Sequence, residues 1–329
     1  MHCVELRGTY YEMGLAQGRI LKDAGFHLHP FGQRLLKFAK QCHNAMVRYA
    51  PDLLEELRGV SDGSGIPYEP LLTSMLTIPY VDVLRGCTVI AVTPERTREG
   101  EPIVGRNYDF FHDVSEDNAT TYICYPHGRY ASVGNCDIFV GREDGLNEKG
   151  LFAAMAAFFY PGLAPGLTFW FIIRLILDRC ATVEEGVELL KKLPHASSYT
   201  YLLADALGKA VVAEPTVEGM EFRYPRNGLL MMTNHAICER WAGKEKFVPQ
   251  DSRPRYESIE RLLGRGQSVG REDMKKTLGD HEGFICSHGH HFPERKFGTL
   301  WSVVGCPGER QLEIAGGHPC RVEYRKVKF

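Results

Sequence analysis

The pattern of apolar residues changes near residue 86, and this change constrains the fold of the 329-residue chain more than any other feature of its sequence. Before it, over residues 1–80, apolar residues recur at the spacing of amphipathic helices. After it, short β-branched runs typical of strands dominate, with a few helical stretches between them. We predict helices at 31–49, 53–60, 70–76, 168–180, 183–192, 254–264 and 271–278, and strands at 88–93, 120–125, 138–140, 151–157, 199–204, 210–214, 229–232 and 300–304. This order favours an α+β fold over regular βαβ alternation.

Composition and charge exclude some classes of partner. Apolar residues make up 44% of the chain and charged residues 24%, and the formal net charge is −2. This is the balance of an ordinary globular protein, and it creates no overall field that would attract nucleic acid. Lysine and arginine are dispersed and form no long basic tract. We therefore expect no nucleic-acid partner.

Residues 151–177 form the one apolar stretch long enough to suggest a membrane span. Prolines and glycines at 161–166 interrupt it, and Arg174 places a charge in its second half. A spanning helix requires about 20 continuous apolar residues. We therefore predict a buried strand, a turn and a buried helix here, and no membrane partner.

The ten cysteines are too dilute for a disulfide framework, and none forms a C-x-x-C pair. The first residues contain no apolar core of signal-peptide length. Both observations favour a reduced protein of the cytoplasm. We expect small buried thiols at Cys3, Cys42, Cys124, Cys136, Cys180, Cys238, Cys286, Cys306 and Cys320.

The segment Ser287-His288-Gly-His290-His291 raises the question of a metal site. Its histidines lack cysteine or carboxylate partners at a spacing typical of metal sites, and Glu294 is isolated. We interpret the segment as a loop with several histidines, and we expect no metal and no other cofactor.

Cys87 is the candidate nucleophile. It follows Gly86 at the start of a predicted strand, and Arg106 and Asp109 follow a second predicted strand at 102–105. If the two strands form an antiparallel hairpin, Cys87 and Arg106 lie at the same end of the sheet. A nearby cation favours the thiolate, which is the reactive form of cysteine.

Five motifs give the chain a resemblance to a known superfamily. In order they are Gly86-Cys87-Thr88, Gly105-Arg106-Asn107-Tyr108-Asp109, Gly145-Leu146-Asn147-Glu148-Lys149-Gly150-Leu151, Thr233-Asn234-His235 and the segment 299–304. Together they resemble the cysteine branch of the N-terminal-nucleophile (Ntn) hydrolases. That branch contains penicillin V acylases, choloylglycine hydrolases, acid-ceramidase-type amidases and the acyl-coenzyme A:6-aminopenicillanic acid acyltransferases, also called isopenicillin N acyltransferase-like proteins. The last group is the nearest, because the first 80 residues, and especially residues 6–14, resemble its helical propeptide.

The resemblance implies a fold and a division of the chain. The fold would be a four-layer αββα sandwich, in which two antiparallel sheets face each other between outer helices. Family members expose their nucleophile by cutting the bond before it, here Gly86–Cys87. The cut would separate a helical propeptide, residues 1–86, from a catalytic chain, residues 87–329, and we expect the two pieces to associate. Glycine at 86 would permit the strained backbone that attack on its carbonyl needs.

The resemblance also assigns roles to four residues. After cleavage, Cys87 would carry a free α-amine whose ordinary pKa of about 7.7–8.0 lets it act as general base for its own thiol. By analogy with the family, Asp109 would hold this amine and Arg106 would lie beside the sulfur. Asn234 would donate its side-chain amide to the oxyanion that develops during attack.

Further residues are candidates for the substrate pocket. The aromatic side chains of Tyr108, Phe110 and Phe158 flank the motifs, and Arg255 resembles part of a Ser/Arg motif of the acyltransferase group. Choloylglycine hydrolases carry another oxyanion-hole asparagine where this chain has Ala157. This difference argues against a bile-salt hydrolase and would leave a backbone N–H as the second donor.

The resemblance implies that Cys87 attacks a linear amide or an acyl thioester, forms an acyl-enzyme and passes the acyl group to an amine or to water. The sequence leaves transfer and hydrolysis open, because both share the acyl-enzyme. A strict amide hydrolase, similar to penicillin V acylase, carcinine hydrolase or ceramidase, is one alternative. A non-catalytic binding protein that kept the fold is another, although binding alone would not require Arg106, Asp109 and Asn234 beside Cys87.

Overall fold

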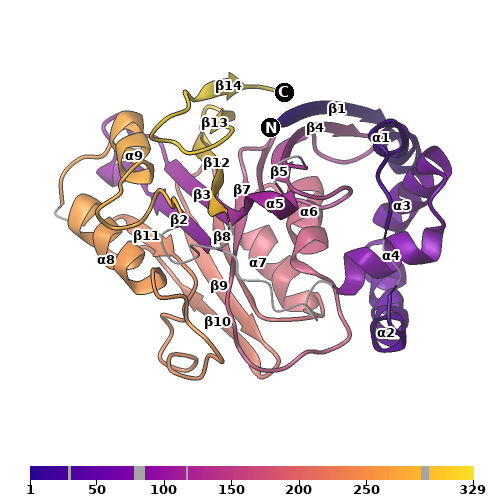
Figure 1. Ribbon diagram of the computed structural model, residues 1–329. Helices are drawn as coiled ribbons and strands as arrows, with labels where there is room; N and C mark the ends of the chain where they lie inside the picture. Colours follow the sequence, from indigo (N-terminus) through magenta and orange to yellow (C-terminus); the bar gives the residue numbers. More distant parts are fainter. Residues whose placement is uncertain (29–30, 78–85, 116–117, 265, 290–295) are drawn as a thin grey trace.

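The computed structural model describes residues 1–28, 31–77, 86–115, 118–264, 266–289 and 296–329 (Figure 1). Two β-sheets lie at its centre, with helices on their outer faces and a helical N-terminal segment at one side. The mixed α+β class with two sheets is therefore confirmed.

The first 77 residues form one strand and four helices: β1 (His2–Gly8), α1 (Tyr10–Asp23), α2 (Gln33–Tyr49), α3 (Pro51–Ser64) and α4 (Tyr68–Thr77). Helices α2, α3 and α4 confirm the predictions from periodicity. A wholly helical segment was nevertheless a wrong expectation, because β1 pairs in parallel with β4 (Thr120–Pro126). The segment before Cys87 therefore contributes a strand to one of the two sheets.

The larger sheet has eight strands in the order β1-β4-β5-β6-β7-β8-β9-β10. Its further members are β5 (Ser132–Cys136), β6 (Asp144–Asn147), β7 (Phe152–Ala157), β8 (Tyr199–Ala204), β9 (Ala210–Thr216) and β10 (Gly219–Arg223). The smaller sheet has six strands in the order β11-β2-β3-β12-β13-β14. These are β11 (Leu229–Met232), β2 (Gly86–Val92), β3 (Ile103–Phe111), β12 (Phe297–Cys306), β13 (Gln311–Ala315) and β14 (Arg325–Val327).

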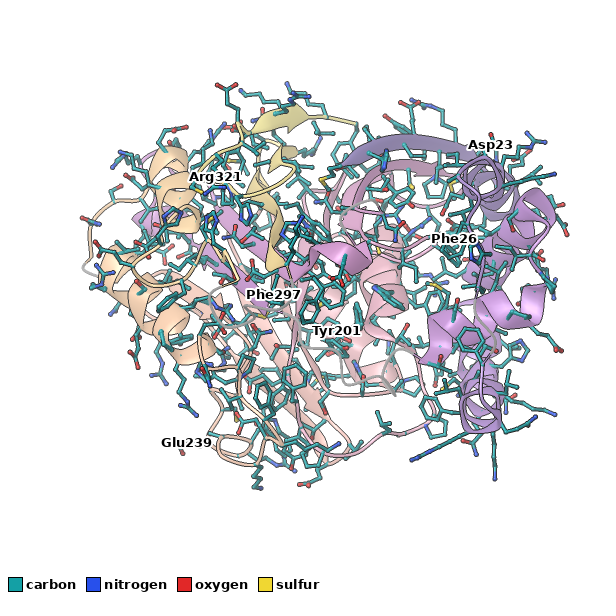
Figure 2. All side chains as sticks on the ribbon, viewed as in Figure 1. Asp23, Phe26, Tyr201, Glu239, Phe297 and Arg321 are labelled. Carbon is teal, nitrogen blue, oxygen red and sulfur yellow. The ribbon has the colours of Figure 1, made fainter. Side chains whose placement is uncertain are left out.

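The two sheets face each other where β2 lies against β7. Helices α6 (Phe169–Arg179) and α7 (Val183–Lys192) cover the larger sheet, and α8 (Ser252–Leu263) and α9 (Arg271–Leu278) cover the smaller one, as Figure 1 shows. A short helix, α5 (His112–Ser115), follows β3. Side chains fill the space between these layers (Figure 2). The order of layers is helix, sheet, sheet, helix.

The predicted strand at 138–140 is wrong. Val140 has a φ of 56°, which a strand does not allow, and its backbone N–H donates to Gln17 Oε1 on α1 at 3.1 Å. Phe139 packs edge-on against Phe26, with the ring centroids 5.9 Å apart. This short apolar run therefore covers the N-terminal segment, and the strand lies just before it, in β5.

The apolar stretch 151–177 forms β7, a loop and α6, as predicted. Among the residues that the structure describes, no helix is long and apolar enough to cross a bilayer.

Candidate active site

The β2–β3 hairpin places Cys87 beside Arg106. The strands are antiparallel, with Cys87 opposite Tyr108 and Gly86 opposite Asp109. Because alternate residues point to opposite faces, Cys87 and Arg106 share the face between the sheets. Arg106 Nη2 lies 3.9 Å from Cys87 Sγ. The juxtaposition predicted from the sequence is present.

Asp144, at the start of β6, holds the Arg106 guanidinium. Both side chains are fully buried, and Arg106 Nη1 donates to Asp144 Oδ2. The carboxylate also accepts hydrogen bonds from Asn135 Nδ2 at 2.7 Å and Trp301 Nε1 at 2.8 Å. A carboxylate fixed by three donors orients the guanidinium and leaves Nη2 facing the sulfur. Sequence reasoning missed Asp144, although it directly precedes the Gly145–Leu151 motif.

Asp109 lies on the opposite face of β3, next to Gly86. A Cβ at position 86 would lie 2.8 Å from Asp109 Oδ2, so the approach of this carboxylate requires glycine. Thr299 Oγ1 donates to Asp109 Oδ1 at 2.6 Å, whereas the buried Oδ2 has no hydrogen-bond partner within the described part of the chain. Burial raises the pKa of Asp109 to about 6, against the lowering effect of Arg255. An unpartnered acceptor therefore faces the bond proposed for cleavage.

Asn234 follows β11 and contacts the backbone nitrogen of Cys87. Its Oδ1 accepts hydrogen bonds from Cys87 N and from Arg255 Nη2, both at 2.8 Å, and its Nδ2 donates to the Ala157 carbonyl at 3.0 Å. Cys87 N and Arg255 Nη2 can only donate, and the Ala157 carbonyl can only accept. These partners therefore fix which end of the Asn234 amide is the oxygen and which is the nitrogen. The second Nδ2 hydrogen is left for another acceptor.

Arg255, on α8, is also part of this site. It is fully buried, and Nη1 donates to the Cys87 carbonyl oxygen and, at 3.1 Å, to Thr88 Oγ1. Ser252, one helical turn earlier, accepts a hydrogen bond from Asn234 N at 2.8 Å. Arg255 thus contacts Cys87 directly, and Ser252 is connected to it through Asn234.

The Cys87 thiol is completely buried in the intact chain. Burial raises its pKa, while the Arg106 guanidinium opposes this rise and Asp109 adds to it. The thiol is therefore protonated at neutral pH, and thiolate formation requires a base next to the sulfur.

The three aromatic pocket candidates are buried. Tyr108 stacks on Trp301 with the ring centroids 4.1 Å apart, and Phe110 lies two residues further along the same face of β3. Phe158 follows Ala157 and packs in a separate cluster with Trp241. An acyl pocket lined by these residues stays a prediction.

The Gly145–Leu151 motif covers most of β6 and the turn that leads into β7. Asn147 Nδ2 donates to the carbonyls of Leu177 and Cys180 at 2.9 and 2.7 Å, and Oδ1 accepts from Lys149 N and Leu151 N. The motif therefore ties the turn to the end of α6.

The cysteines are less uniformly buried than the sequence suggested. Cys3 and Cys320 are exposed and Cys238 is half-buried, which corrects the expectation for these three. Cys3 is exposed because it lies on the outward face of β1 with Glu5 and Arg7, and Cys320 because it lies in the connection between β13 and β14.

In the uncleaved chain, obtained by carrying Cys87→Ala in every protein compared, Asp109→Asn should weaken the pH dependence of stability between about pH 4 and pH 6. An unfolded aspartate has a pKa of about 3.9, below the value of about 6 that Asp109 has in the folded chain. The folded state thus binds more protons in this window, and the free energy of unfolding falls as pH rises through it. By pH 7 the variant should have gained about 3 kcal/mol relative to the same uncleaved chain with Asp109. Urea unfolding at each pH measures this, and parallel pH profiles would contradict it.

Comparisons with known proteins agree with this fold. The family model for acyl-coenzyme A:6-aminopenicillanic acid acyl-transferase matches residues 96–320. A curated relative, protein dcd1B of Dictyostelium discoideum, is 27% identical over 228 residues, which cover 58% of this chain and 45% of the relative. The chain thus spans less than half the length of that relative.

Three solved structures share the Ntn-hydrolase fold. Penicillin V acylase from Agrobacterium tumefaciens has a TM-score of 0.51 at 17% identity, over 74% of this chain and 86% of its own. An N-acylethanolamine-hydrolyzing acid amidase ortholog from Caenorhabditis elegans has 0.50 at 17%, over 68% and 93%. A variant of conjugated bile acid hydrolase from Clostridium perfringens has 0.50 at 15%, over 74% and 97%. Because the family model covers well over half of the sequence, the chain belongs to the acyl-coenzyme A:6-aminopenicillanic acid acyl-transferase family.

Proposed function

We propose that the chain is a cysteine acyltransferase or amidohydrolase whose N-terminal nucleophile is Cys87, released by cleavage of the Gly86–Cys87 bond. The observation that carries the proposal is the set of contacts around one residue. Arg106 lies beside the Cys87 sulfur, Asn234 holds its nitrogen and Arg255 holds its carbonyl oxygen. Three different side chains thus contact the thiol, the nitrogen and the carbonyl of Cys87. This arrangement suits an N-terminal nucleophile, which uses both its thiol and its amine.

In the proposed cleavage, Cys87 Sγ attacks the Gly86 carbonyl carbon. The thiol proton moves to the Cys87 nitrogen, the C–N bond breaks, and a thioester joins Gly86 to the sulfur. Water then hydrolyses the thioester, which leaves a carboxylate on Gly86 and a free thiol and α-amine on Cys87. Asp109 Oδ2, which lies close to Gly86 and has no hydrogen-bond partner among the described residues, would accept a hydrogen bond from the new amine.

In the proposed reaction, the Cys87 amine takes the thiol proton, and the thiolate attacks the substrate carbonyl. The second Nδ2 hydrogen of Asn234 donates to the oxyanion that forms. The substrate amide or thioester bond then breaks, and its amine or thiol leaves with a proton. The acyl group on Cys87 passes to an amine in acyl transfer, or to water in hydrolysis.

Acylation of Cys87 tests this function directly. The purified protein is incubated with N-acyl amines and acyl thioesters while the mass of chain 87–329 is followed. A transient mass increase equal to the acyl group, on the Cys87 peptide, is expected. Release of the acyl group to an added amine indicates a transferase, and release only to water indicates the strict amide hydrolase. A substrate that is bound without any adduct or turnover would favour the non-catalytic binding protein.

The N-terminal segment should stay bound after cleavage. Strand β1 is part of the larger sheet, and Glu56 on α3 forms a fully buried ion pair with Arg174 on α6, at 3.1 Å. Tyr10 donates to Asp178 on the same helix at 2.6 Å. These contacts support a cleaved protein of two associated chains.

Glu56→Ala removes one partner of the buried ion pair with Arg174 and should destabilise the protein by about 2–4 kcal/mol. After cleavage, part of chain 1–86 should therefore be released. Glu55→Ala is the matched control. Glu55 is exposed and pairs with the exposed Arg58, so its loss should change stability by less than about 0.5 kcal/mol. Urea unfolding and native mass spectrometry measure both effects. Equal effects of the two substitutions would refute the anchoring role.

A further inference from the structure

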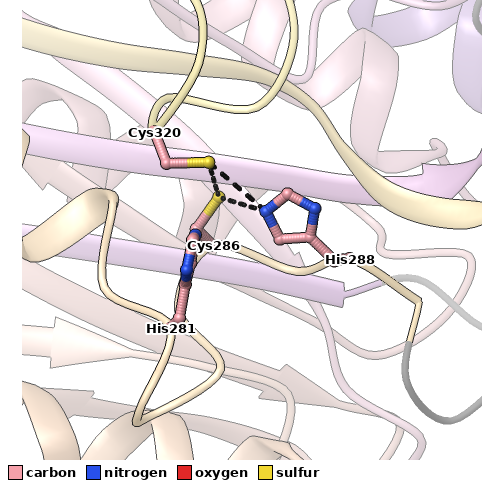
Figure 3. A group of neighbouring side chains, drawn as sticks. All are labelled: His281, Cys286, His288 and Cys320. Atoms are coloured by element: carbon pink, nitrogen blue, oxygen red, sulfur yellow. Dashed lines mark hydrogen bonds between the residues drawn. The ribbon is translucent and has the colours of Figure 1, made fainter.

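Four metal-ligating side chains converge outside the candidate active site. His281, Cys286, His288 and Cys320 each offer one ligand atom, and the four atoms all lie within 4.8 Å of one another (Figure 3). Three come from the segment after α9, and Cys320 comes from the turn between β13 and β14. Sequence reasoning missed this group because it considered only the histidines at 288–291 and had no means of bringing Cys320 to them.

The three distances among Cys286, His288 and Cys320 fit a tetrahedral zinc site. Cys286 Sγ lies 3.6 Å from Cys320 Sγ and 3.5 Å from His288 Nε2, and Cys320 Sγ lies 3.3 Å from the same nitrogen. With Zn–S bonds of about 2.3 Å and Zn–N bonds of about 2.0–2.1 Å, tetrahedral geometry gives S···S of about 3.8 Å and S···N of about 3.6 Å. The observed separations agree within a few tenths of an ångström. The two sulfurs are also well beyond the S–S distance of about 2.05 Å in a disulfide.

We propose that His281, Cys286, His288 and Cys320 bind one structural Zn²⁺ in a closed site of two cysteines and two histidines. Thiolate with imidazole is the donor set that selects zinc over magnesium or calcium. Four protein ligands leave no position open for substrate, which is typical of structural rather than catalytic zinc. Two thiolates and two neutral imidazoles also balance the charge of the ion.

Neighbouring rings support the His288 imidazole. The His318 ring stacks on it, with centroids 4.1 Å apart and an interplanar angle of 13°. The His281 ring meets it edge-on at 4.9 Å. Packing on two sides restricts the rotation of a ligand, which is what a preformed metal site requires.

The zinc site would also position Asp109, an effect that rests on the proposed function. Ser287, between two of the ligands, forms a pair of hydrogen bonds with Thr299: Thr299 N donates to its carbonyl, and its own N–H donates to Thr299 Oγ1, each at 3.0 Å. The same Thr299 hydroxyl donates to Asp109 Oδ1. A metal bound by Cys286 and His288 would fix the position of Ser287 between them. Through Thr299 it would thereby fix the Asp109 carboxylate next to Gly86.

Metal analysis of the full chain tests the site. Wild-type protein, Cys320→Ser and the control Cys3→Ser are purified under reducing conditions, and bound zinc is measured by inductively coupled plasma mass spectrometry before and after titration with Zn²⁺. Cys3 is the matched control because it is exposed, like Cys320, but lies outside the group. We expect about one tightly bound zinc per chain in the wild type and in Cys3→Ser, and a loss of at least about tenfold in affinity in Cys320→Ser.

Two further measurements keep the result decisive. Co²⁺ bound in place of zinc should give the intense visible spectrum of a tetrahedral thiolate site in the wild type, and Cys320→Ser should lose it. Cys87→Ala should retain the zinc, which separates a failure of this site from a failure of the proposed function. A wild type that takes up no zinc, equal zinc affinity in Cys320→Ser, or a Cys286–Cys320 disulfide in the purified protein would overturn the proposal.

Discussion

Cys87→Ala should remain a single chain and lose its activity. Wild-type protein should separate under denaturing conditions into chains 1–86 and 87–329, because the thiol attacks the Gly86 carbonyl in the proposed cleavage. Without the sulfur there is neither a nucleophile for cleavage nor one for substrate, so turnover should fall by about 10⁴-fold or more. Intact mass spectrometry and an amidase assay measure the two effects separately.

Cys124→Ala is the matched control for this experiment. Cys124 is also a fully buried cysteine, and its sulfur lies 2.8 Å from the Nη2 of a buried arginine, Arg142. Cys124 is therefore buried beside an arginine, as Cys87 is. It is not preceded by a glycine that lies opposite an aspartate, as Gly86 lies opposite Asp109. It should be processed and should turn over substrate normally. A wild type that is fully active with its Gly86–Cys87 bond intact would falsify the free-amine mechanism.

The sequence could predict the parts of the site that are close along the chain. Two adjacent strand patterns joined by a turn specify the β2–β3 hairpin, and the hairpin alone brings Arg106 to Cys87. Asn234 follows β11 and Arg255 lies on α8, and both contact Cys87. No local sequence pattern could predict that these two elements lie next to β2. Only the motif resemblance selected the two residues. The structure places both of them within hydrogen-bonding distance of Cys87.

The missed features depend on partners far along the chain. Strand β1 has mostly exposed residues and pairs with β4, so its apolar pattern is too weak to identify it alone. Asp144 is an ordinary acidic residue until β6 lies across from Arg106. Cys320 acquires possible ligand partners only when its turn folds against the segment after α9. In each case the signal lies in the pairing of two segments.

Asn234 supports the Cys87 nitrogen through Oδ1 and offers an N–H through Nδ2, and two substitutions separate these roles. Asn234→Asp keeps an oxygen that can accept from Cys87 N and Arg255 Nη2, but it removes the amide donor. Asn234→Ala removes both. Both variants should lower kcat by about 10²–10³-fold with a smaller change in KM, because the oxyanion exists only after attack.

Cleavage should respond differently from turnover in these two variants. Asn234→Asp retains the acceptor that holds the Cys87 nitrogen, so most of it should be cut, whereas Asn234→Ala should be cut more slowly. Turnover is therefore normalised to the cleaved fraction, which intact mass spectrometry gives for each preparation. If Asn234→Asp is cleaved and keeps kcat within about threefold of the wild type, Nδ2 does not stabilise the oxyanion. Asn234 would then act by holding Cys87 N and its neighbours in position, and a backbone N–H near Ala157 would be the next candidate donor.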